Sequence, residues 1–377
     1  MPYASSMSTH EDLGVAAAET IGQVLDKLGS SPDFAIVFMS GYFKKQITKI
    51  QEAVNKLLTP TALMGCTADA VICGGQEVEN QSALTLFAGN LDGKVSPIRI
   101  SDSLDFSKVA SVSPAGADAH TMLLLADPFS FPAEAAIDRF QSTYPNMKLI
   151  GGLISSAQTH PTGSLFLNGE IYGDGAVALL IGGEVQIEPL VSQGCRPIGT
   201  PLIVTKSEGN LVHELGGQPA LQRLESIFAS MDEDERLQAS HGLHVGRVID
   251  EHQTDFTSGD FLIRAVIGAD SDKGLVAIGD AAPVGSTIQF QVRDARTASD
   301  DLVHKVSQLA DGDGALLFTC NGRGTNLFES PNHDASRIAS CIPGEVVAGM
   351  FCAGEIGPVS TQSFLHGYTA SAAIFHD

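Results

Sequence analysis

The chain has 377 residues, of which 43% are hydrophobic and 18% are charged, a composition typical of a globular protein rather than a disordered one. Its 44 acidic and 22 basic side chains give a formal net charge of −22. This charge argues against binding to nucleic acid or to an anionic membrane surface, because both carry negative charge and attract a positively charged protein face. We therefore expect no nucleic-acid partner and no membrane partner.

The first thirty residues contain no basic segment ahead of an apolar one, so they do not resemble a secretory signal peptide. The spacing of Leu13, Ile21 and Val24 instead predicts an amphipathic helix within residues 1–29. The cysteines form no C-x-x-C pair, so we expect free thiols and a cytoplasmic location. They are Cys66, Cys73, Cys195, Cys320, Cys341 and Cys352.

Three segments of the chain repeat one order of predicted elements: an apolar strand, a loop, an amphipathic helix, a second strand with a glycine turn, and a last strand. The first strands of the copies are FAIVFM, TMLLLA and ALLFT, and the second strands carry MGCTA, IGGLISS and AGMFCAG. Three matches in one order indicate duplication, although βαβ order is also common in unrelated α/β proteins. The predicted fold class is therefore α/β, with two domains of mixed β-sheets flanked by helices and built from repeated β-loop-α-β-Gly turn-β units.

Between the second and third copies the pattern changes. Consecutive apolar runs between residues 243 and 293 predict strands joined by hairpin-like turns. A polar, acidic segment, MDEDERLQASHG, precedes them and is the best candidate for a domain boundary. We therefore predict an N-terminal helix in residues 1–29, one domain over 30–228 and a second domain over 229–377.

Several of these motifs together resemble the FIST family. They include MGCTADAVICGGQEVE, LIGGLISS, QGCRPIGTPLIVT, CNGRGTNLF, AGMFCAGEIGP and LHGYTASAAIF, and they extend over nearly the whole chain beyond residue 30. The resemblance implies both an N-terminal and a C-terminal FIST domain, in a family named for F-box proteins and intracellular signal transduction. It also implies a sensory module for small ligands such as amino acids. Many members join this module to a kinase, a receptor or an F-box, and none is visible in these 377 residues. We therefore expect a signalling protein partner or independent action, with a homo-oligomer as an open alternative.

The clearest candidate site is the loop formed by residues 320–324, which follows a predicted strand and precedes a helix. Glycines allow a tight turn, consecutive backbone amides can hold an anion, and an arginine offers a planar fork to a carboxylate. The alternative is a structural turn whose arginine pairs with a nearby carboxylate. The predicted ligand-binding residues here are Cys320, Asn321, Gly322, Arg323 and Gly324.

A second predicted loop carries Gly354 and Glu355 after the next strand. If the two strands are parallel, both loops leave the same edge of the sheet. Glu355 could then hold the ammonium of an amino acid while Arg323 holds its carboxylate. A direct salt bridge between Arg323 and Glu355, with no ligand, explains the pattern equally well.

Two further hypotheses concern other residues. Cys320, Glu355 and His366 are candidate catalytic groups, because a nearby arginine can activate a thiol and a histidine or carboxylate can accept its proton. The alternative is an inert buried thiol. Gly65, Cys66 and Thr67 form the equivalent turn of the first repeat and could line a second pocket, or could mark only tight packing.

The sequence contains no complete metal-ligand set and no cofactor motif, so no metal and no cofactor are predicted. The leading hypothesis is a sensory protein that binds a small ligand, such as an amino acid or another small carboxylate, on the CNGRG and GEIG loops. The alternatives are an enzyme that acts on a small metabolite through the same loops, and a protein-interaction scaffold.

Overall fold

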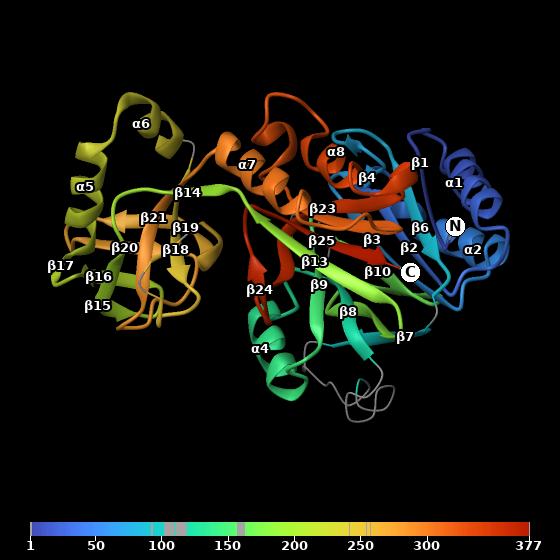
Figure 1. Cartoon of the computed structure of the whole chain (residues 1–377), viewed down its shortest axis with the longest axis horizontal. Coiled ribbons are helices and arrows are strands. Elements are labelled where there is room, and N and C mark those ends of the chain that lie inside the picture. The colour runs from blue at the N-terminus through green and yellow to red at the C-terminus, as the bar shows by residue number, and fades with distance from the viewer. Residues whose placement is uncertain are drawn as a thin grey trace. The chain divides into compact units, whose positions relative to one another are not determined.

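The computed structural model describes residues 2–91, 93–101, 109, 119–156, 163–240, 242–253, 255–256 and 258–376. The chain divides into two compact units, shown in Figure 1. The first comprises residues 1–191, 302–365 and 369–377, and the second comprises residues 192–301 and 366–368. These units do not coincide with the segments 30–228 and 229–377, because strands from both ends of the chain share one sheet of the first unit.

Two mixed sheets form the first unit. The smaller sheet has the strand order β1 (Tyr3–Ser8), β6 (Leu84–Gly89), β2 (Phe34–Ser40), β3 (Ala62–Ala68), β10 (Leu165–Leu167) and β11 (Glu170–Tyr172). The larger sheet runs β13 (Gln186–Gln193), β25 (Thr369–His376), β22 (Gly314–Cys320), β23 (Val347–Val359), β9 (Lys148–Ile154), β8 (Ala119–Ala126), β12 (Ala176–Gly183) and β7 (Gly93–Ile100). Strands β4 (Val71–Cys73) and β24 (Gln362–His366) also pair with β23, and β5 (Gln76–Val78) pairs with β4.

The two sheets pack face to face over an aromatic core. Phe38 of the smaller sheet meets Phe318 of the larger one with ring centroids 6.1 Å apart, and Phe87 meets Phe375 at 5.6 Å. Strand β2 is apolar on both faces, so alternate residues serve two cores. Phe34, Ile36 and Phe38 face the inter-sheet core, whereas Ala35, Val37 and Met39 pack in the cluster beneath the helices.

Helices cover the outer faces of both sheets and complete a four-layered unit. Helices α1 (Leu13–Leu28) and α2 (Ile47–Leu57) bury their apolar faces against the smaller sheet, and α4 (Ala133–Thr143) buries its apolar face against the larger one. Helix α1 begins where the Asp12 side chain accepts a hydrogen bond from the Val15 amide, and ends at Gly29. It is preceded by edge strand β1, which the sequence analysis did not predict.

The three repeated segments share one connectivity. In each, the first strand pairs in parallel with the second strand and antiparallel with the last. The three sets are β2, β3 and β6; β8, β9 and β12; and β22, β23 and β25. Mixed sheets flanked by helices in two units confirm the predicted α/β class. Superposition of the three units, as expected from duplication, stays a prediction.

The predicted glycine turns are a correction, because these glycines lie inside the second strand of each unit. A Cβ on Gly349 would lie 1.9 Å from the carbonyl oxygen of Leu317, its register partner in β22. In the other two units, a Cβ on Gly151 would lie 1.9 Å from the carbonyl oxygen of Leu124, and a Cβ on Gly65 would lie 2.5 Å from that of Val37. Close approach of two strand backbones, rather than a turn, therefore selects glycine here.

The second unit is built on a closed barrel. Its strands run β21 (Thr287–Arg293), β15 (Leu202–Glu208), β16 (Leu211–Leu215), β20 (Leu275–Ile278), β19 (Phe261–Asp270) and β18 (Leu243–Val248), and β18 pairs again with β21. Short strands β14 (Cys195–Pro197) and β17 (Gln218–Pro219) and helix α5 (Ala220–Ser230) complete it. The acidic segment expected to be a boundary instead forms α6 (Glu233–Ser240) within this unit.

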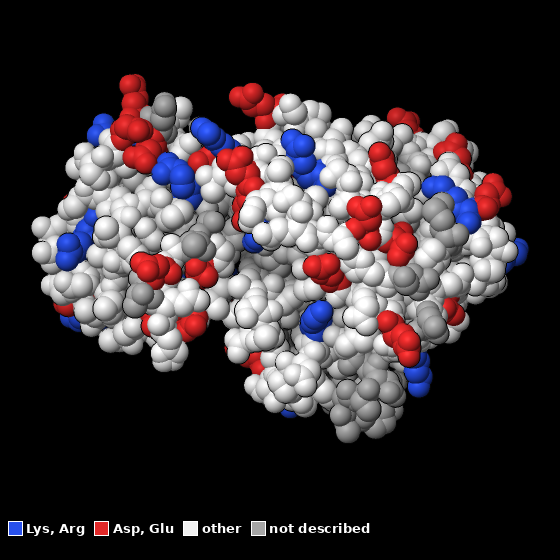
Figure 2. Space-filling model, in the orientation of Figure 1, with Lys and Arg blue, Asp and Glu red and all other residues white. Residues whose placement is uncertain are grey.

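Acidic side chains outnumber basic ones two to one in the sequence, and Figure 2 shows them scattered over the visible face rather than gathered in one patch. Within the described ranges, every helix is too short or too polar to cross a bilayer.

Candidate ligand-binding site

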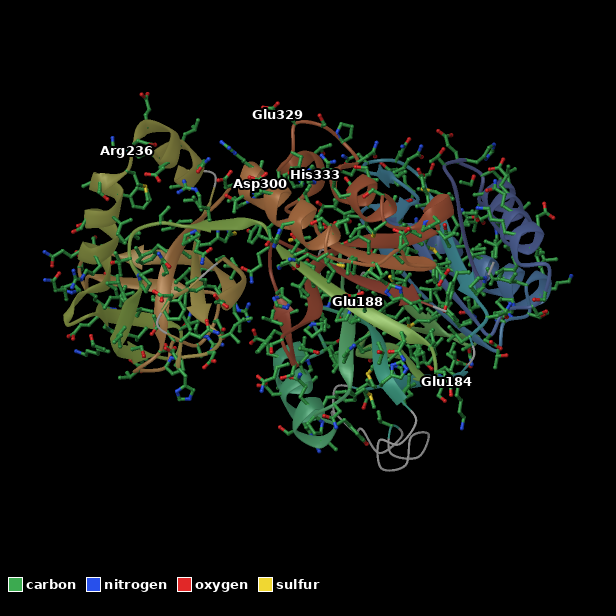
Figure 3. All side chains as sticks on the ribbon, in the orientation of Figure 1. Glu184, Glu188, Arg236, Asp300, Glu329 and His333 are labelled. Carbon is green, nitrogen blue, oxygen red and sulfur yellow. The ribbon has the colours of Figure 1, made fainter. Side chains whose placement is uncertain are left out.

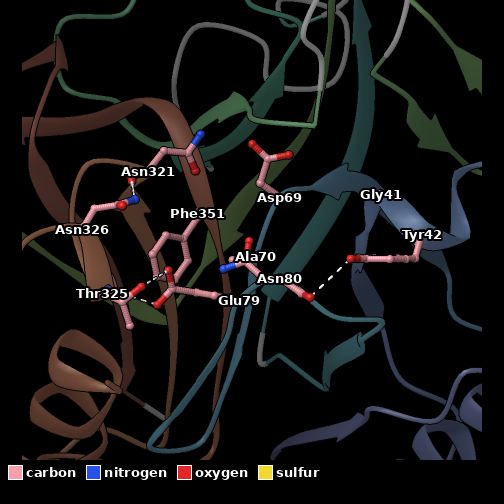
Figure 4. A pocket seen from close by; sticks show the side chains of 10 residues that line it. All are labelled: Gly41, Tyr42, Asp69, Ala70, Glu79, Asn80, Asn321, Thr325, Asn326 and Phe351. Carbon is pink, nitrogen blue, oxygen red and sulfur yellow. Dashed lines mark hydrogen bonds between the residues drawn. The ribbon is translucent and has the colours of Figure 1, made fainter. Parts of the chain in front are cut away.

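A pocket of about 640 Å³ opens in the first unit, where loops following several strands meet (Figure 4). A volume in this range suits a small organic molecule. The lining comes from the loops after β2, β3, β5 and β22, and from β23 itself. The lining residues are Gly41, Tyr42, Asp69, Ala70, Glu79, Asn80, Asn321, Thr325, Asn326 and Phe351.

Backbone pairing between the two sheets creates this meeting point. The amide of Phe351 in β23 donates to the carbonyl of Ala70, 3.0 Å away, so the loop after β3 of the smaller sheet is held against β23 of the larger one. Carboxyl ends of parallel strands are the usual place for ligand crevices in α/β sheets. The loops after β2 and β3 of the first repeat and after β22 of the third repeat therefore converge on one cavity.

Asp69 is held at the pocket by its backbone. Its amide donates to the Ser155 hydroxyl at 2.8 Å, and that hydroxyl donates to the Phe351 carbonyl at 2.7 Å. Asp69 is exposed as a residue, and the part of its carboxyl that is withdrawn from water raises its pKa. This carboxylate accepts no hydrogen bond from any residue in the described ranges, and in Figure 4 no dashed line reaches it. Asp69 therefore presents an exposed carboxylate to the cavity, and no described residue donates a hydrogen bond to it.

Glu79 fastens the loop after β22 to the pocket wall. Its carboxylate accepts from the amide of Thr325 at 3.1 Å and from the Thr325 hydroxyl at 2.8 Å. Gly324 directly precedes Thr325 and has a φ of +55°. A Cβ added to it would lie 2.6 Å from the Phe351 ring. Both the left-handed backbone and the lack of space require glycine at this position.

Arg323 does not line the pocket, although the sequence pattern predicted that it would contact ligand. Its side chain is fully buried, and its Nε and Nη2 donate to the two carboxylate oxygens of Asp334 at 2.6 and 2.8 Å. The Thr319 hydroxyl donates to the same carboxylate at 2.6 Å, and His333, labelled in Figure 3, lies 2.9 Å from it. The side of the fork expected to bind a ligand carboxylate is thus occupied by a residue of the protein.

The charges in this buried cluster are strongly coupled. Burial alone would raise the pKa of Asp334, but the guanidinium of Arg323 and the hydrogen bonds from its neighbours hold that pKa well below its usual range. Nearby Glu77 accepts from the amide of Ala335 at 2.9 Å. Burial, with the Asp334 charge adding to it, raises the pKa of Glu77 to about 7. Arg323 is therefore neutralised within the core.

Glu355 lies within β23 and not in a loop, so the predicted GEIG loop is also a correction. It pairs in register with Gly152 of β9, is fully buried, and accepts from the amide and hydroxyl of Thr369 at 3.1 and 2.8 Å. Burial raises the pKa of Glu355 to about 8, although hydrogen bonds from Thr369 and from the thiol of Cys320 oppose this. Gly354 lies in the same strand, packed against Leu153.

The predicted thiol chemistry has one supporting contact. Cys320 ends β22 with a side chain that is nearly buried, and its sulfur accepts a hydrogen bond from the Gly322 amide at 3.4 Å. Its thiol also bonds to Glu355. His366, the other candidate base, is buried at the end of β24 and belongs to the second compact unit.

The first-repeat candidates serve packing rather than the pocket. A Cβ on Gly65 would lie 2.2 Å from the Phe166 ring, the Cys66 thiol contacts the sulfur of Met350 at 3.2 Å, and burial raises the Cys66 pKa. The Thr67 hydroxyl bonds to that of Ser156. All six cysteines are free, as the sequence predicted.

Of the predicted ligand residues, Asn321 is the one that lines this pocket. Sequence analysis missed Asp69, Glu79 and Tyr42, although each lies just beyond a strand, at the kind of position used to select Asn321. The same criterion, a polar residue just after a strand, also points to Asp69, which directly follows the predicted strand carrying Gly65 and Cys66.

The chain combines an α/β unit that carries a loop-lined pocket with a unit built on a β-barrel, and comparison with known proteins places it in a family. The model of the FIST N domain matches residues 33–218, and that of the FIST C domain matches residues 220–358. The chain belongs to the FIST family. FIST domains are associated with the sensory domains of signal-transduction proteins.

Two relatives are similar over their full length. An uncharacterized protein of Mycobacterium bovis is 39% identical over 384 residues, covering 98% of this chain and 97% of the relative. An uncharacterized protein of Mycobacterium tuberculosis is 39% identical over 387 residues, covering 98% of each chain.

Proposed function

We propose that the protein is a cytoplasmic sensory protein that binds a small molecule in the pocket beside Asp69 and Asn321. The observation that carries this proposal is a small-molecule-sized cavity at converging strand ends, with polar side chains that no hydrogen bond joins to the described residues. Besides the Asp69 carboxylate, the side-chain amides of Asn80 and Asn321 make no hydrogen bond to the described residues. Unpartnered polar groups around a cavity are what a hydrogen-bonding ligand requires.

The CNGRG loop keeps a role in this proposal, but a divided one. Asn321 contributes to the pocket wall, and Arg323 anchors the loop through Asp334. A ligand that displaces Thr325 from Glu79 would loosen the loop, which offers a route from binding to a protein partner.

The test begins with native mass spectrometry of the purified protein to identify a bound small molecule. Asn321→Phe then places a ring in the cavity without removing a side-chain hydrogen bond. We expect it to abolish binding, measured by calorimetry, while the circular dichroism melt stays close to that of the wild type. Binding that survives this substitution would place the ligand elsewhere.

An enzyme acting on a small metabolite is the second candidate, because the Cys320 thiol bonds to the Glu355 carboxyl. Above its raised pKa of about 8, the Glu355 carboxylate could accept the thiol proton and generate a nucleophile. Turnover in a metabolite panel that disappears in Cys320→Ser would favour this function. Binding without turnover would favour the sensory one.

A further inference from the structure

We propose that the pocket selects small organic cations, such as primary amines, with Asp69 as the counter-charge. This inference rests on the proposed function and names the class of its ligand. It reverses the expectation of a carboxylate ligand, which depended on a free guanidinium fork at Arg323.

The charge of the lining supports a cation. Asp69 and Glu79 are the charged residues among the ten that line the pocket, and both are acidic. Lys44 and Lys45 lie on the same 3-10 helix as Tyr42 but are not part of the lining. Among the described lining residues, an anionic ligand would have two carboxylates nearby and no cation to offset them, whereas a cation would be attracted by both.

The groups behind the pocket do not change this balance. The guanidinium of Arg323 is paired with Asp334 inside the protein, and Glu77 adds a second carboxyl to the same cluster. Besides the imidazole of His333, which lies against Asp334, the cluster carries the Arg323 guanidinium and the carboxyl groups of Asp334 and Glu77. It supplies no net positive charge to an anion bound next to it.

The two carboxylates have different roles. Glu79 already accepts two hydrogen bonds from Thr325, whereas the Asp69 carboxylate accepts none from the described residues. Asp69 is thus the free acceptor for an ammonium group. The amides of Asn80 and Asn321 can accept further N–H or O–H groups, and the ring of Phe351 provides an apolar wall.

The experiment compares ligands of matched skeleton and different charge. A panel contains putrescine, 4-aminobutyrate and succinate, together with tyramine, tyrosine and 4-hydroxyphenylacetate, and binding is followed by ligand-observed NMR on the full chain. We expect an amine to bind and the matched acids not to bind. Asp69→Asn should weaken amine binding about tenfold or more, as for loss of a charge-assisted hydrogen bond.

Two control variants separate the possible failures. Asp26→Asn makes the same charge change on the exposed face of α1 and should leave amine binding unchanged. If an acid binds and Asn321→Phe abolishes that binding, the pocket is the ligand site but the cation proposal is wrong. If amine binding is equally affected by Asp69→Asn and Asp26→Asn, the cation proposal is also wrong. Binding that persists in Asn321→Phe, or a panel in which nothing binds, counts against both the pocket and its selectivity.

Discussion

The two carboxylate oxygens of Asp334 accept hydrogen bonds from Nε and Nη2 of Arg323, and both side chains are completely buried. This ion pair explains why Arg323, which the sequence pattern predicted to bind a ligand carboxylate, does not line the pocket. Asp334 binds the loop after β22 through Arg323, and Glu79 binds it through Thr325. Asn321 of the same loop lines the cavity.

The first prediction concerns this pair. Arg323→Lys keeps the charge but loses the planar fork, so the free energy of unfolding should fall by about 1.5–3 kcal/mol, as for loss of a charge-assisted hydrogen bond. Urea denaturation at pH 7 measures the change. Asp334→Asn, which leaves the buried guanidinium without its counter-charge, should cost more, about 3–5 kcal/mol. Wild-type stability in both variants would contradict the described pairing.

The second prediction concerns the glycines inside the second strands. Gly349→Ala places a Cβ against the Leu317 carbonyl, so we expect a loss of about 3 kcal/mol, at the upper end of overpacking costs. Gly22→Ala in α1 is the matched control, because its Cβ meets nothing within 4 Å. It should stabilise the protein by about 0.5–1 kcal/mol through helix propensity. Thermal melts of the two variants should therefore shift in opposite directions.

The third prediction concerns pH. Burial raises the pKa of Glu355 to about 8 in the folded protein, above the ordinary value of 4.5 in the unfolded chain. The folded state therefore holds the proton that the unfolded state has lost, so this stabilising contribution falls as pH rises from about 4.5 through 8. Glu77, with a pKa raised to about 7, acts in the same direction.

Glu355→Gln should flatten this dependence, because a neutral amide does not titrate. Relative to the wild type, the variant should gain stability between pH 5 and pH 8, by up to about 1.4 kcal/mol per pH unit. Urea titrations at pH 5, 6, 7 and 8 provide the comparison. A constant difference between the two proteins across this range would show that Glu355 does not titrate within it.

The fourth prediction concerns thiol reactivity. Burial raises the pKa of Cys66, of Cys352 and, to about 11, of Cys73, so these thiols should react slowly. Cys320 has an amide donor at its sulfur and the guanidinium of Arg323 in its surroundings, and we expect iodoacetamide to label it first. Peptide mapping over time gives the order. Prior labelling of Cys195 or Cys341 would remove the basis for thiol catalysis.

The sequence by itself determined the local structure and the family. Apolar runs such as residues 34–39 and the amphipathic spacing of α1 depend only on periodicity, and the repeated order of elements predicted an α/β fold with mixed sheets. Motifs spread along the chain were sufficient to identify both FIST domains, because each is a local string of residues.

Only the tertiary structure decided which charges meet and which glycines turn. Asp334 is eleven residues from Arg323 in the sequence, and nothing local distinguishes it from Glu355 as a partner. Gly349 and Gly354 are typical turn residues in the sequence, yet both lie in a thirteen-residue strand, where a neighbouring backbone or side chain leaves little space for a Cβ. Asp69 and Asn321 share one pocket because two sheets join at Phe351 and Ala70. Such long-range pairing depends on how the sheets pack, and local periodicity carries no information about it.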